Sequence, residues 1–402
     1  MKSWVKIIIA LFAGLSFGII FGNQFQIITV VGNTFINLLK MIAGLLVFVS
    51  IITSISHIND PKKMCRIWAR TISFYVITTL IAIGLGISIG FLLKPGASLS
   101  YSYDFSVSAT YYKSGLLDFI SSMVPSNPFA AFANGNILQI IVFAIFFAFA
   151  IILSGDKGKP AILFFESISS IMNKLTCIIM KFAPYGVFAL IVTTVGSNGV
   201  NVIIPLAKLL LCNFIACAIH VVVVFGFSLH ILSRTKIGLF LRGMKDAILV
   251  AFTTSSSSAT LPVSIECARN KLGVSDDISG FVLSLGSTIN MNGAAIGQAI
   301  AAIFIAQAYG VELTILKIAI LTLTVLLSAV GTAGIPGQSI IMLSVVLNSI
   351  GLPLEGIALV AGVDRIRDMI STVVNILGDA VAMMYVAHKE KRVTVVSKCS
   401  YV

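Results

Sequence analysis

The last apolar segment of the chain carries polar side chains at helical spacing. Asp364, Asp368, Thr372, Asn375 and Asp379 lie in an otherwise apolar run. At about 100° per residue these five positions fall within one helix face roughly 80° wide. Carboxylates inside a membrane cost several kcal/mol unless they meet cations or bound ligands. The spacing therefore predicts a site for a cation or an ammonium group.

An alternative is that the same carboxylates form buried ion pairs with Arg365 and Arg367. Helical geometry places Arg367 roughly 100° from the centre of the polar face. Arg365 lies nearer to that face, so we expect Arg365 to neutralise Asp364.

A second polar stretch, between Gly286 and Ala294, interrupts the earlier apolar segment 277–308. It contains Thr288, Asn290 and Asn292 at alternate positions. Amide oxygens, and carbonyls freed by a break in the helix, are hard donors suited to Na⁺. Polar residues also join helices to each other, so this signal is weak alone. Together with Asp379 it predicts a Na⁺ site.

A serine run from Thr253 to Ser258 precedes Pro262 and divides another apolar segment. The free N–H groups at the start of the following half-helix favour an anion. Asp368 can hold an ammonium opposite, which describes a pocket for an amino acid zwitterion. A membrane-embedded serine hydrolase is the competing interpretation. His220 and His230 lie in another segment and supply no base, so we expect no enzyme.

The composition predicts the elements that position these residues. Of 402 residues, 58% are hydrophobic and 10% charged, which excludes a soluble core. Apolar runs of about 20 residues recur along the chain, each long enough to cross a bilayer. We predict an all-α polytopic membrane protein whose eight transmembrane helices lie at 4–22, 33–56, 71–93, 116–153, 164–195, 202–232, 277–308 and 354–387. The fourth, 116–153, is long enough for a broken or doubled element.

Two further segments, 237–268 and 313–350, are each divided into half-helices, by the serine run and by residues 331–337. We expect each to be a re-entrant hairpin followed by one long span. By span count the two units have opposite orientations, as in inverted-repeat transporters that bind cargo near the midplane. The alternative is that the two interruptions are Ser/Gly linkers between ordinary spans. Such linkers would be flanked by polar residues, whereas these interruptions are flanked by apolar residues.

The net charge of +12 would suggest binding to nucleic acid if the basic residues clustered on a soluble domain. Here the basic residues gather in alternate short loops, which is the positive-inside pattern. We therefore expect a multi-pass protein of a bacterial inner membrane, with both termini cytoplasmic and no nucleic-acid partner. The residues that carry this pattern are Lys2, Lys6, Lys62, Lys63, Arg66, Arg70, Lys157, Lys159, Arg234 and Lys236.

These motifs, in this order, closely resemble the dicarboxylate/amino acid:cation symporter family, which contains glutamate transporters and neutral amino acid transporters. The resemblance covers nearly the whole chain. It implies a homotrimer in which 1–70 and 114–201 form a scaffold. Segments 71–113 and 202–402 would form a transport domain that moves like an elevator. The motifs that carry it are Ser126-Asn127-Pro128-Phe129, Phe182-Ala183-Pro184-Tyr185-Gly186, the serine run, Asn290-Met291-Asn292-Gly293, Gly331 to Gly337, and the polar helix face from Asp364 to Asp379.

The resemblance also implies roles for single positions. Asp368 and Thr372 would hold the substrate's amino group, and Asn375 its α-carboxylate. The other expected substrate contacts are Ser255, Ser256, Ser257, Ile335 and Ser371. One Na⁺ site would use Gly286, Asn290, Asn375 and Asp379, a second Thr288, Met291 and Thr332, and a third Tyr75, Thr78, Thr79, Asn290 and Asn292.

Departures from the family pattern concern the substrate. Acidic-substrate members have an arginine where this chain has Ser371 or Ser255, and a threonine at Ala294. Burying a second carboxylate without a partner is costly, so we predict Na⁺-coupled symport of a small neutral amino acid such as serine, alanine or threonine. The alternative is an acidic amino acid or C4-dicarboxylate carrier, coupled to Na⁺ or H⁺, that uses Arg367 or Arg365. Asn292 replaces the aspartate of the third site, so we expect two Na⁺ ions.

Overall fold

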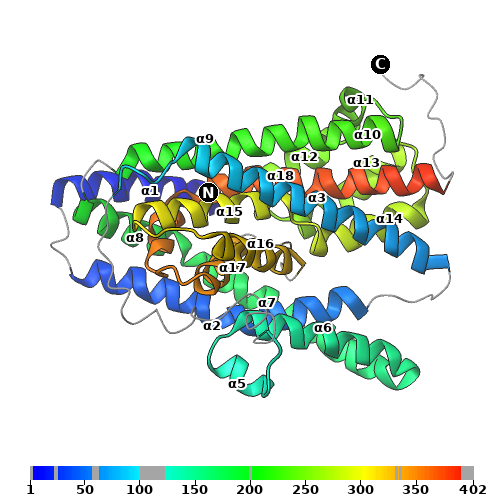
Figure 1. Ribbon diagram of the computed structural model, residues 1–402, viewed down its shortest axis with the longest axis horizontal. Coiled ribbons are helices and arrows are strands. Elements are labelled where there is room, and N and C mark those ends of the chain that lie inside the picture. The colour runs from blue at the N-terminus through cyan, green and yellow to red at the C-terminus, as the bar shows by residue number, and fades with distance from the viewer. Residues whose placement is uncertain are drawn as a thin grey trace.

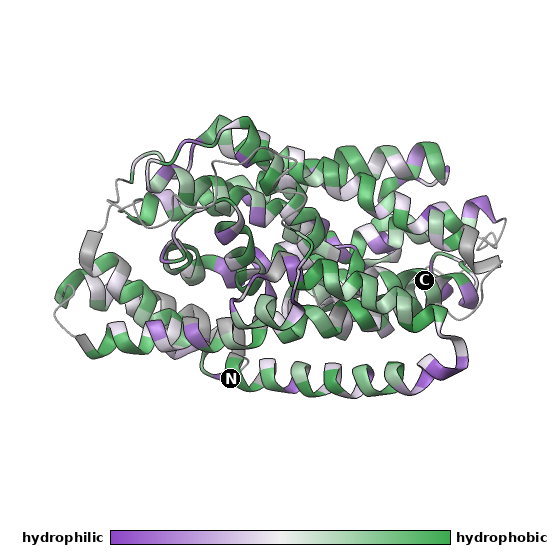
Figure 2. Ribbon diagram, turned by 60° about the horizontal axis from the view of Figure 1, so that its bottom comes forward, coloured by the Kyte–Doolittle hydropathy of each residue, from purple (hydrophilic) through white to green (hydrophobic). Residues whose placement is uncertain are grey.

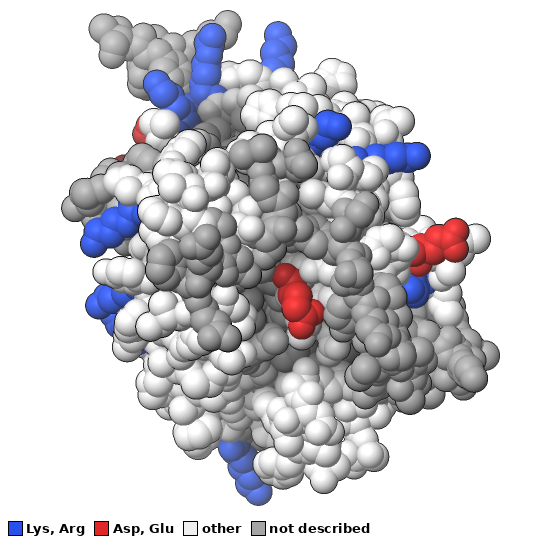
Figure 3. Space-filling view, turned by 90° about the vertical axis from the view of Figure 1, so that its left-hand side faces the viewer, with Lys and Arg blue, Asp and Glu red and all other residues white. Residues whose placement is uncertain are grey.

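The computed structural model describes residues 3–21, 26–56, 63–99, 123–198, 202–330, 334 and 337–390, and this part of the chain contains helices and no strand (Figure 1). Apolar residues run along most of each helix, and many hydrophilic residues lie near helix ends (Figure 2). At the end of the molecule shown in Figure 3, most of the described surface is uncharged and acidic atoms lie in a central hollow. This distribution fits a protein surrounded by lipid.

One group of helices comes from the first half of the chain. α1 packs on α8, and α2 packs on α6, α7 and α8. Gly14 permits the close approach of α1 to α8, because a Cβ there would lie 3.0 Å from the Phe188 carbonyl oxygen. The helices are α1 (Ser3–Phe21), α2 (Gln26–Ser56), α5 (Pro128–Ala133), α6 (Ile137–Leu153), η2 (Gly155–Gly158), α7 (Lys159–Lys181) and α8 (Ala183–Asn198).

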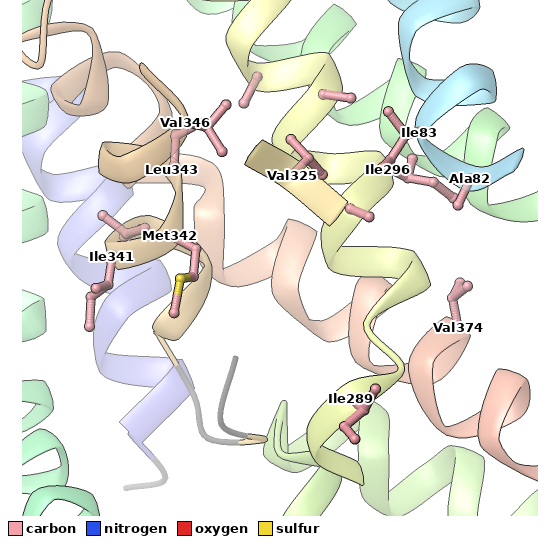
Figure 4. Close-up of a cluster of buried hydrophobic side chains, with 14 of the residues drawn as sticks. Ala82, Ile83, Ile289, Ile296, Val325, Ile341, Met342, Leu343, Val346 and Val374 are labelled. Atoms are coloured by element: carbon pink, nitrogen blue, oxygen red, sulfur yellow. The ribbon is translucent and has the colours of Figure 1, made fainter. Parts of the chain in front are cut away.

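The second group surrounds α15 (Asn292–Ala308), in which every residue except Gln307 is buried. α3 (Lys63–Leu93), α18 (Gly356–Lys389) and α17 (Gln338–Ser349) pack against it, and Figure 4 shows apolar side chains of α3, α14, α15, α16 and α17 meeting there. The remaining helices are α9 (Ile203–Ile219), η4 (His220–Phe225), α10 (Gly226–Leu232), α11 (Ile237–Gly243), α12 (Lys245–Thr254), α13 (Ser257–Asn270), α14 (Asp276–Ile289) and α16 (Ile315–Val330).

Both expected half-helix pairs are confirmed. α12 packs against α13, and α16 packs against α17. The span expected at 277–308 is interrupted between α14 and α15, at Asn290 and Met291. The last span is one continuous helix, α18. Every element that the polar motifs require is therefore present.

One expected span was wrong in detail, and another is broken, as its length had allowed. The segment 164–195 is two helices, α7 and α8, which meet at Phe182. The described part of 116–153 begins with a turn and the short helix α5, because Asn127 and Asn136 cap α5 and α6 separately. Among the described residues four helices are long and apolar enough to cross a membrane, namely 67–93, 203–232, 276–308 and 356–389. The count of eight spans stays a prediction.

Candidate substrate and cation site

The serine run forms the tip of the first hairpin. α12 ends where Ser255 takes a left-handed conformation with φ of 52°. Ser256 is extended, and its side chain accepts a hydrogen bond from the Ala259 N–H at 3.1 Å, which caps α13. Ser255, Ser256 and Ser257 are all buried. A side-chain cap at this position is the physical reason that the helix restarts inside apolar surroundings.

The two hairpin tips touch at Gly334. The Ser256 hydroxyl donates to the Gly334 carbonyl at 2.6 Å, and the Ser258 N–H donates to the same oxygen at 3.1 Å. A Cβ at Gly334 would lie 2.7 Å from the Ser258 Oγ and 2.7 Å from the Ser287 carbonyl oxygen. Only glycine fits there, so the backbones of both tips and of α14 meet at one point.

Asp368 joins α18 to the second hairpin. Its carboxylate is buried and accepts hydrogen bonds from the Gly337 N–H at 3.3 Å and from the Ser339 hydroxyl at 3.1 Å. These donors belong to the start of α17, where the N-cap residue Gly337 has no side chain to cap the helix. Asp368 therefore stabilises the N-terminus of α17 from another helix. Neither Ser339 nor this contact was predicted.

The first expected cation site contains a buried cluster of oxygen atoms that could bind a cation. The Asn290 amide donates to Asp379 Oδ1 at 2.8 Å and to the Asn375 carbonyl at 3.3 Å. The Asn290 Oδ1 is buried with no hydrogen-bond partner in the described chain. A Cβ at Gly286 would lie 2.5 Å from Asp379 Oδ1, so glycine is needed beside the carboxylate. A carboxylate next to an unpartnered amide oxygen fits a hard cation.

Asn375 holds the start of α15. Its Oδ1 accepts hydrogen bonds from the Gly293 N–H at 2.8 Å and the Ala294 N–H at 3.4 Å. Its amide nitrogen lies 3.2 Å from the Met291 sulfur. The side chain thus caps a broken helix, and its backbone carbonyl faces Asn290.

The third expected cation site contains a neutral hydrogen-bond network. The Thr79 hydroxyl donates to Asn292 Oδ1 at 2.7 Å, and the Asn292 amide donates to the Thr78 hydroxyl at 3.2 Å. The Tyr75 hydroxyl donates to the Val282 carbonyl at 3.0 Å. Each of these four side chains is buried and hydrogen-bonded within the protein, and none of the four carries charge. Asn290, the fifth residue expected here, bonds Asp379 instead.

Three other expected site residues bond within their own helices or lie in the core. The Thr372 hydroxyl donates to the Asp368 carbonyl at 2.8 Å, and the Thr288 hydroxyl to the Leu285 carbonyl at 3.1 Å. Ser371 is buried, and its carbonyl oxygen would be 2.2 Å from a Cβ at Gly293. Thr332 and Ile335 lie outside the described residues.

The two arginines have roles opposite to those expected. Arg367 donates to Asp364 from Nε at 3.0 Å and also from Nη2, and both side chains are buried. Arg365 instead reaches the first hairpin, where its Nη2 donates to the Thr254 carbonyl at 3.3 Å. The prediction that Arg365 neutralises Asp364 was wrong, because Arg367 is three residues from Asp364 and can turn back along the helix.

The geometry defines a class of protein. A helix broken between α14 and α15, two hairpin tips in contact and buried carboxylates beside them are the features of a secondary membrane transporter. The chain belongs to the sodium:dicarboxylate symporter family, whose profile matches residues 4–389.

Curated relatives agree with this family. The chain is 38% identical over 372 residues to the proton/glutamate-aspartate symporter of Escherichia coli, covering 90% of this chain and 85% of that protein. It is 36% identical over 396 residues to the proton/sodium-glutamate symport protein of Bacillus subtilis, covering 96% and 92%. It is 32% identical over 400 residues to the C4-dicarboxylate transport protein of Bacillus subtilis, covering 96% and 93%. None of these names supports the predicted neutral amino acid; they favour the acidic alternative.

Proposed function

We propose that this chain is a cation-coupled symporter of a small dicarboxylic substrate, either an acidic amino acid or a C4-dicarboxylate. The observation that carries this proposal is the position of Arg365. Its guanidinium lies at the serine-rich tip, against Thr254, although neither Ser255 nor Ser371 is an arginine. Arginine binds carboxylates through a planar, multiply donating group.

The Arg365 guanidinium has an N–H group that is left for a ligand at the serine-rich tip. Its Nε is buried and has no hydrogen-bond partner among the described residues, and the neighbouring Ser255 Oγ is also buried without one. Asp364, which would otherwise compete for this guanidinium, is held by Arg367. With an acidic amino acid as substrate, Asp368, on the next turn of α18, would face the ammonium group and Arg365 the second carboxylate; with a C4-dicarboxylate, Arg365 would face one of the two carboxylates.

Uptake into proteoliposomes tests the proposal. We expect aspartate or succinate uptake under a Na⁺ or H⁺ gradient, with little serine uptake. Arg365→Gln should reduce dicarboxylate uptake at least tenfold, since a bond between charged groups contributes about 1.5–3 kcal/mol. Arg269→Gln removes a partly exposed arginine of α13 and is the matched control. Strong serine uptake that Arg365→Gln leaves unchanged would overturn the proposal.

A small neutral amino acid is the second candidate. Ser371 and Ala294 favour it, because neither side chain can pair with a second carboxylate. In that case Ser371→Ala should weaken serine binding, and aspartate should not compete with serine.

For the coupling ion, we propose that Na⁺ or a proton is bound by Asp379 with Asn290 and backbone oxygens, and that a second Na⁺ site lies near Thr288, Met291 and the second hairpin. The neutral network around Asn292 supports no third ion. Asp379→Asn should raise the Na⁺ concentration for half-maximal substrate binding at least tenfold, as calorimetry would show. An unchanged Na⁺ dependence would exclude Asp379 as a ligand.

We further propose the elevator arrangement of the family, with α1, α2 and α5–α8 as a trimeric scaffold in a bacterial inner membrane. The packing of α1 on α8, and of α2 on α6, α7 and α8, supports this division, and α8 of this group also contacts α18. Light scattering of the purified protein should give a protein mass of three times 42.8 kDa. A monomeric mass would contradict the trimer and leave the substrate proposal intact.

A further inference from the structure

A cavity lies on the opposite side of α3 from its contact with α15, between α3, η4, α10 and the end of α18. Its volume is about 640 Å³, within the range of small-molecule sites. Most of its wall is apolar, formed by residues such as Phe74, Ile77 and Val224. The Ser228 hydroxyl on this wall donates to the Val224 carbonyl at 2.7 Å, so it needs no partner from a ligand.

The cavity opens sideways through apolar side chains. Ile77 is 57% exposed, Val223 59% and Phe227 65%. In a membrane protein such a face meets lipid chains, and an apolar chain can enter without breaking a hydrogen bond. The occupant is therefore expected to be hydrocarbon for most of its length.

The cavity has the length of one lipid leaflet. Arg70 and Ile81 both line it, and they are 11 residues apart on α3. At about 1.5 Å per residue this separation is roughly 16 Å, close to half of the 30 Å hydrocarbon core. A single acyl chain from one leaflet therefore matches the cavity from its charged end to the middle of the membrane.

The charged end is basic. Arg70 lines the cavity and bonds Glu390 at 2.5 Å, and Leu232 lines it two residues before the exposed Arg234. In Figure 1 the first turns of α3 and the last turns of α10 and α18 lie at the same end of the molecule. Arg70 lies on the cavity wall and pairs with Glu390, and Arg234, Lys236 and Lys389 follow the lining residues Leu232 and Tyr385 by two to four positions.

We propose that this cavity binds one anionic phospholipid, with an acyl chain between α3 and α10 and its phosphate beside Arg70 and Arg234. Basic pockets at helix ends are a known means of selecting anionic headgroups. Tyr385, which lines the cavity and stacks on Phe74 with ring centroids 5.8 Å apart, stands where the chain meets the headgroup.

The lipid would lie next to the neutral network of the site. Thr78 lines the cavity and also accepts the Asn292 amide hydrogen bond at 3.2 Å. An occupied cavity would hold this part of α3 in place.

Native mass spectrometry of the detergent-purified full chain tests this proposal with phosphatidylglycerol and phosphatidylcholine added separately. We expect one phosphatidylglycerol per chain to be retained at least tenfold more strongly than phosphatidylcholine. Ser73→Trp fills the cavity from α3 and should abolish that retention. Ser88→Trp places the same bulk on an exposed position of α3 outside the cavity and should not. Arg70→Gln should remove the headgroup preference but not chain binding.

Two results would overturn the proposal. One is equal retention of the two lipids by the unaltered chain, which indicates annular lipid only. The other is retention by Ser73→Trp equal to that of Ser88→Trp. The readout is lipid mass, so a wrong substrate assignment would leave it unaffected.

Discussion

The two hairpin tips break their helices by different chemistry. At the first tip, the chain supplies its own stop and start, because Ser255 turns left-handed and Ser256 caps α13. At the second tip, Gly337 has φ of 84° and precedes α17, for which the described residues of this hairpin supply no side-chain cap. Its partners are Asp368 of α18 and, through Gly334, the first tip.

The difference indicates which tip can move. The first half-helix is capped by a residue of its own hairpin, so its capping hydrogen bond moves with it. The second is capped by Asp368 of another helix, so its capping hydrogen bond breaks when the hairpin moves away from α18. A substrate ammonium at Asp368 would also compete with the α17 cap. We therefore propose that the second hairpin opens more readily than the first, and we expect substitutions at the two tips to have different consequences.

The largest effect is expected for Asp368→Asn. Both carboxylate oxygens accept hydrogen bonds, from Gly337 and Ser339, and an amide can replace only one of them and carries no charge. The loss of about 2–3 kcal/mol corresponds to a fall in substrate affinity of roughly 30- to 150-fold. Calorimetric titration measures it. An affinity within threefold of the unaltered protein would exclude Asp368 from binding.

Ser256→Ala should have the next largest effect. It removes the cap of α13 and the bond to Gly334, together about 2 kcal/mol, or roughly 30-fold in the population of touching tips. The control is Ser258→Ala, because the exposed Ser258 side chain is lost while its N–H still donates to Gly334. Initial uptake rates should fall only for Ser256→Ala; equal rates in the two variants would show that the tip contact is unimportant.

Gly337→Ala should reduce uptake about tenfold. A left-handed alanine costs roughly 1–2 kcal/mol, which the second tip would avoid by changing shape. Gly310→Ala is a matched control, since Gly310 has φ of 65° at the end of α15 with open space around it. Both variants should unfold at lower temperature, but only Gly337→Ala should lose uptake. Equal uptake would place the second tip outside the gating mechanism.

The smallest effect is expected for Lys271→Ala. Lys271 and Asp246 pair at 2.5 Å across the base of the first hairpin, and their side chains are 35% and 58% exposed. Solvent screens an ion pair at such an exposed place, so the pair stabilises the hairpin little and uptake should change less than twofold. A larger loss would mean that the first hairpin also depends on partners outside its tip.

The sequence could predict the broken helices because serine, glycine and proline act locally on the backbone. It also placed Asp379 and Asn290 together, since each interrupts an apolar run. It failed for α7 and α8, because the apolar residues on both sides of Phe182 were assigned to one span although Lys181 and Pro184 flank the break. It also missed Ser339, since a single serine in an apolar half-helix resembles ordinary core.

By itself the sequence determined the class of protein, because the length of each apolar run, and the position of the polar residues within it, can be read from the order of residues. The tertiary structure alone decided the partners. Helical periodicity gives only the direction in which Arg365 and Arg367 leave the helix. Which of them meets Asp364 and which reaches Thr254 depends on how α12 and α18 pack. That choice moves the expected substrate from a neutral amino acid to a dicarboxylate.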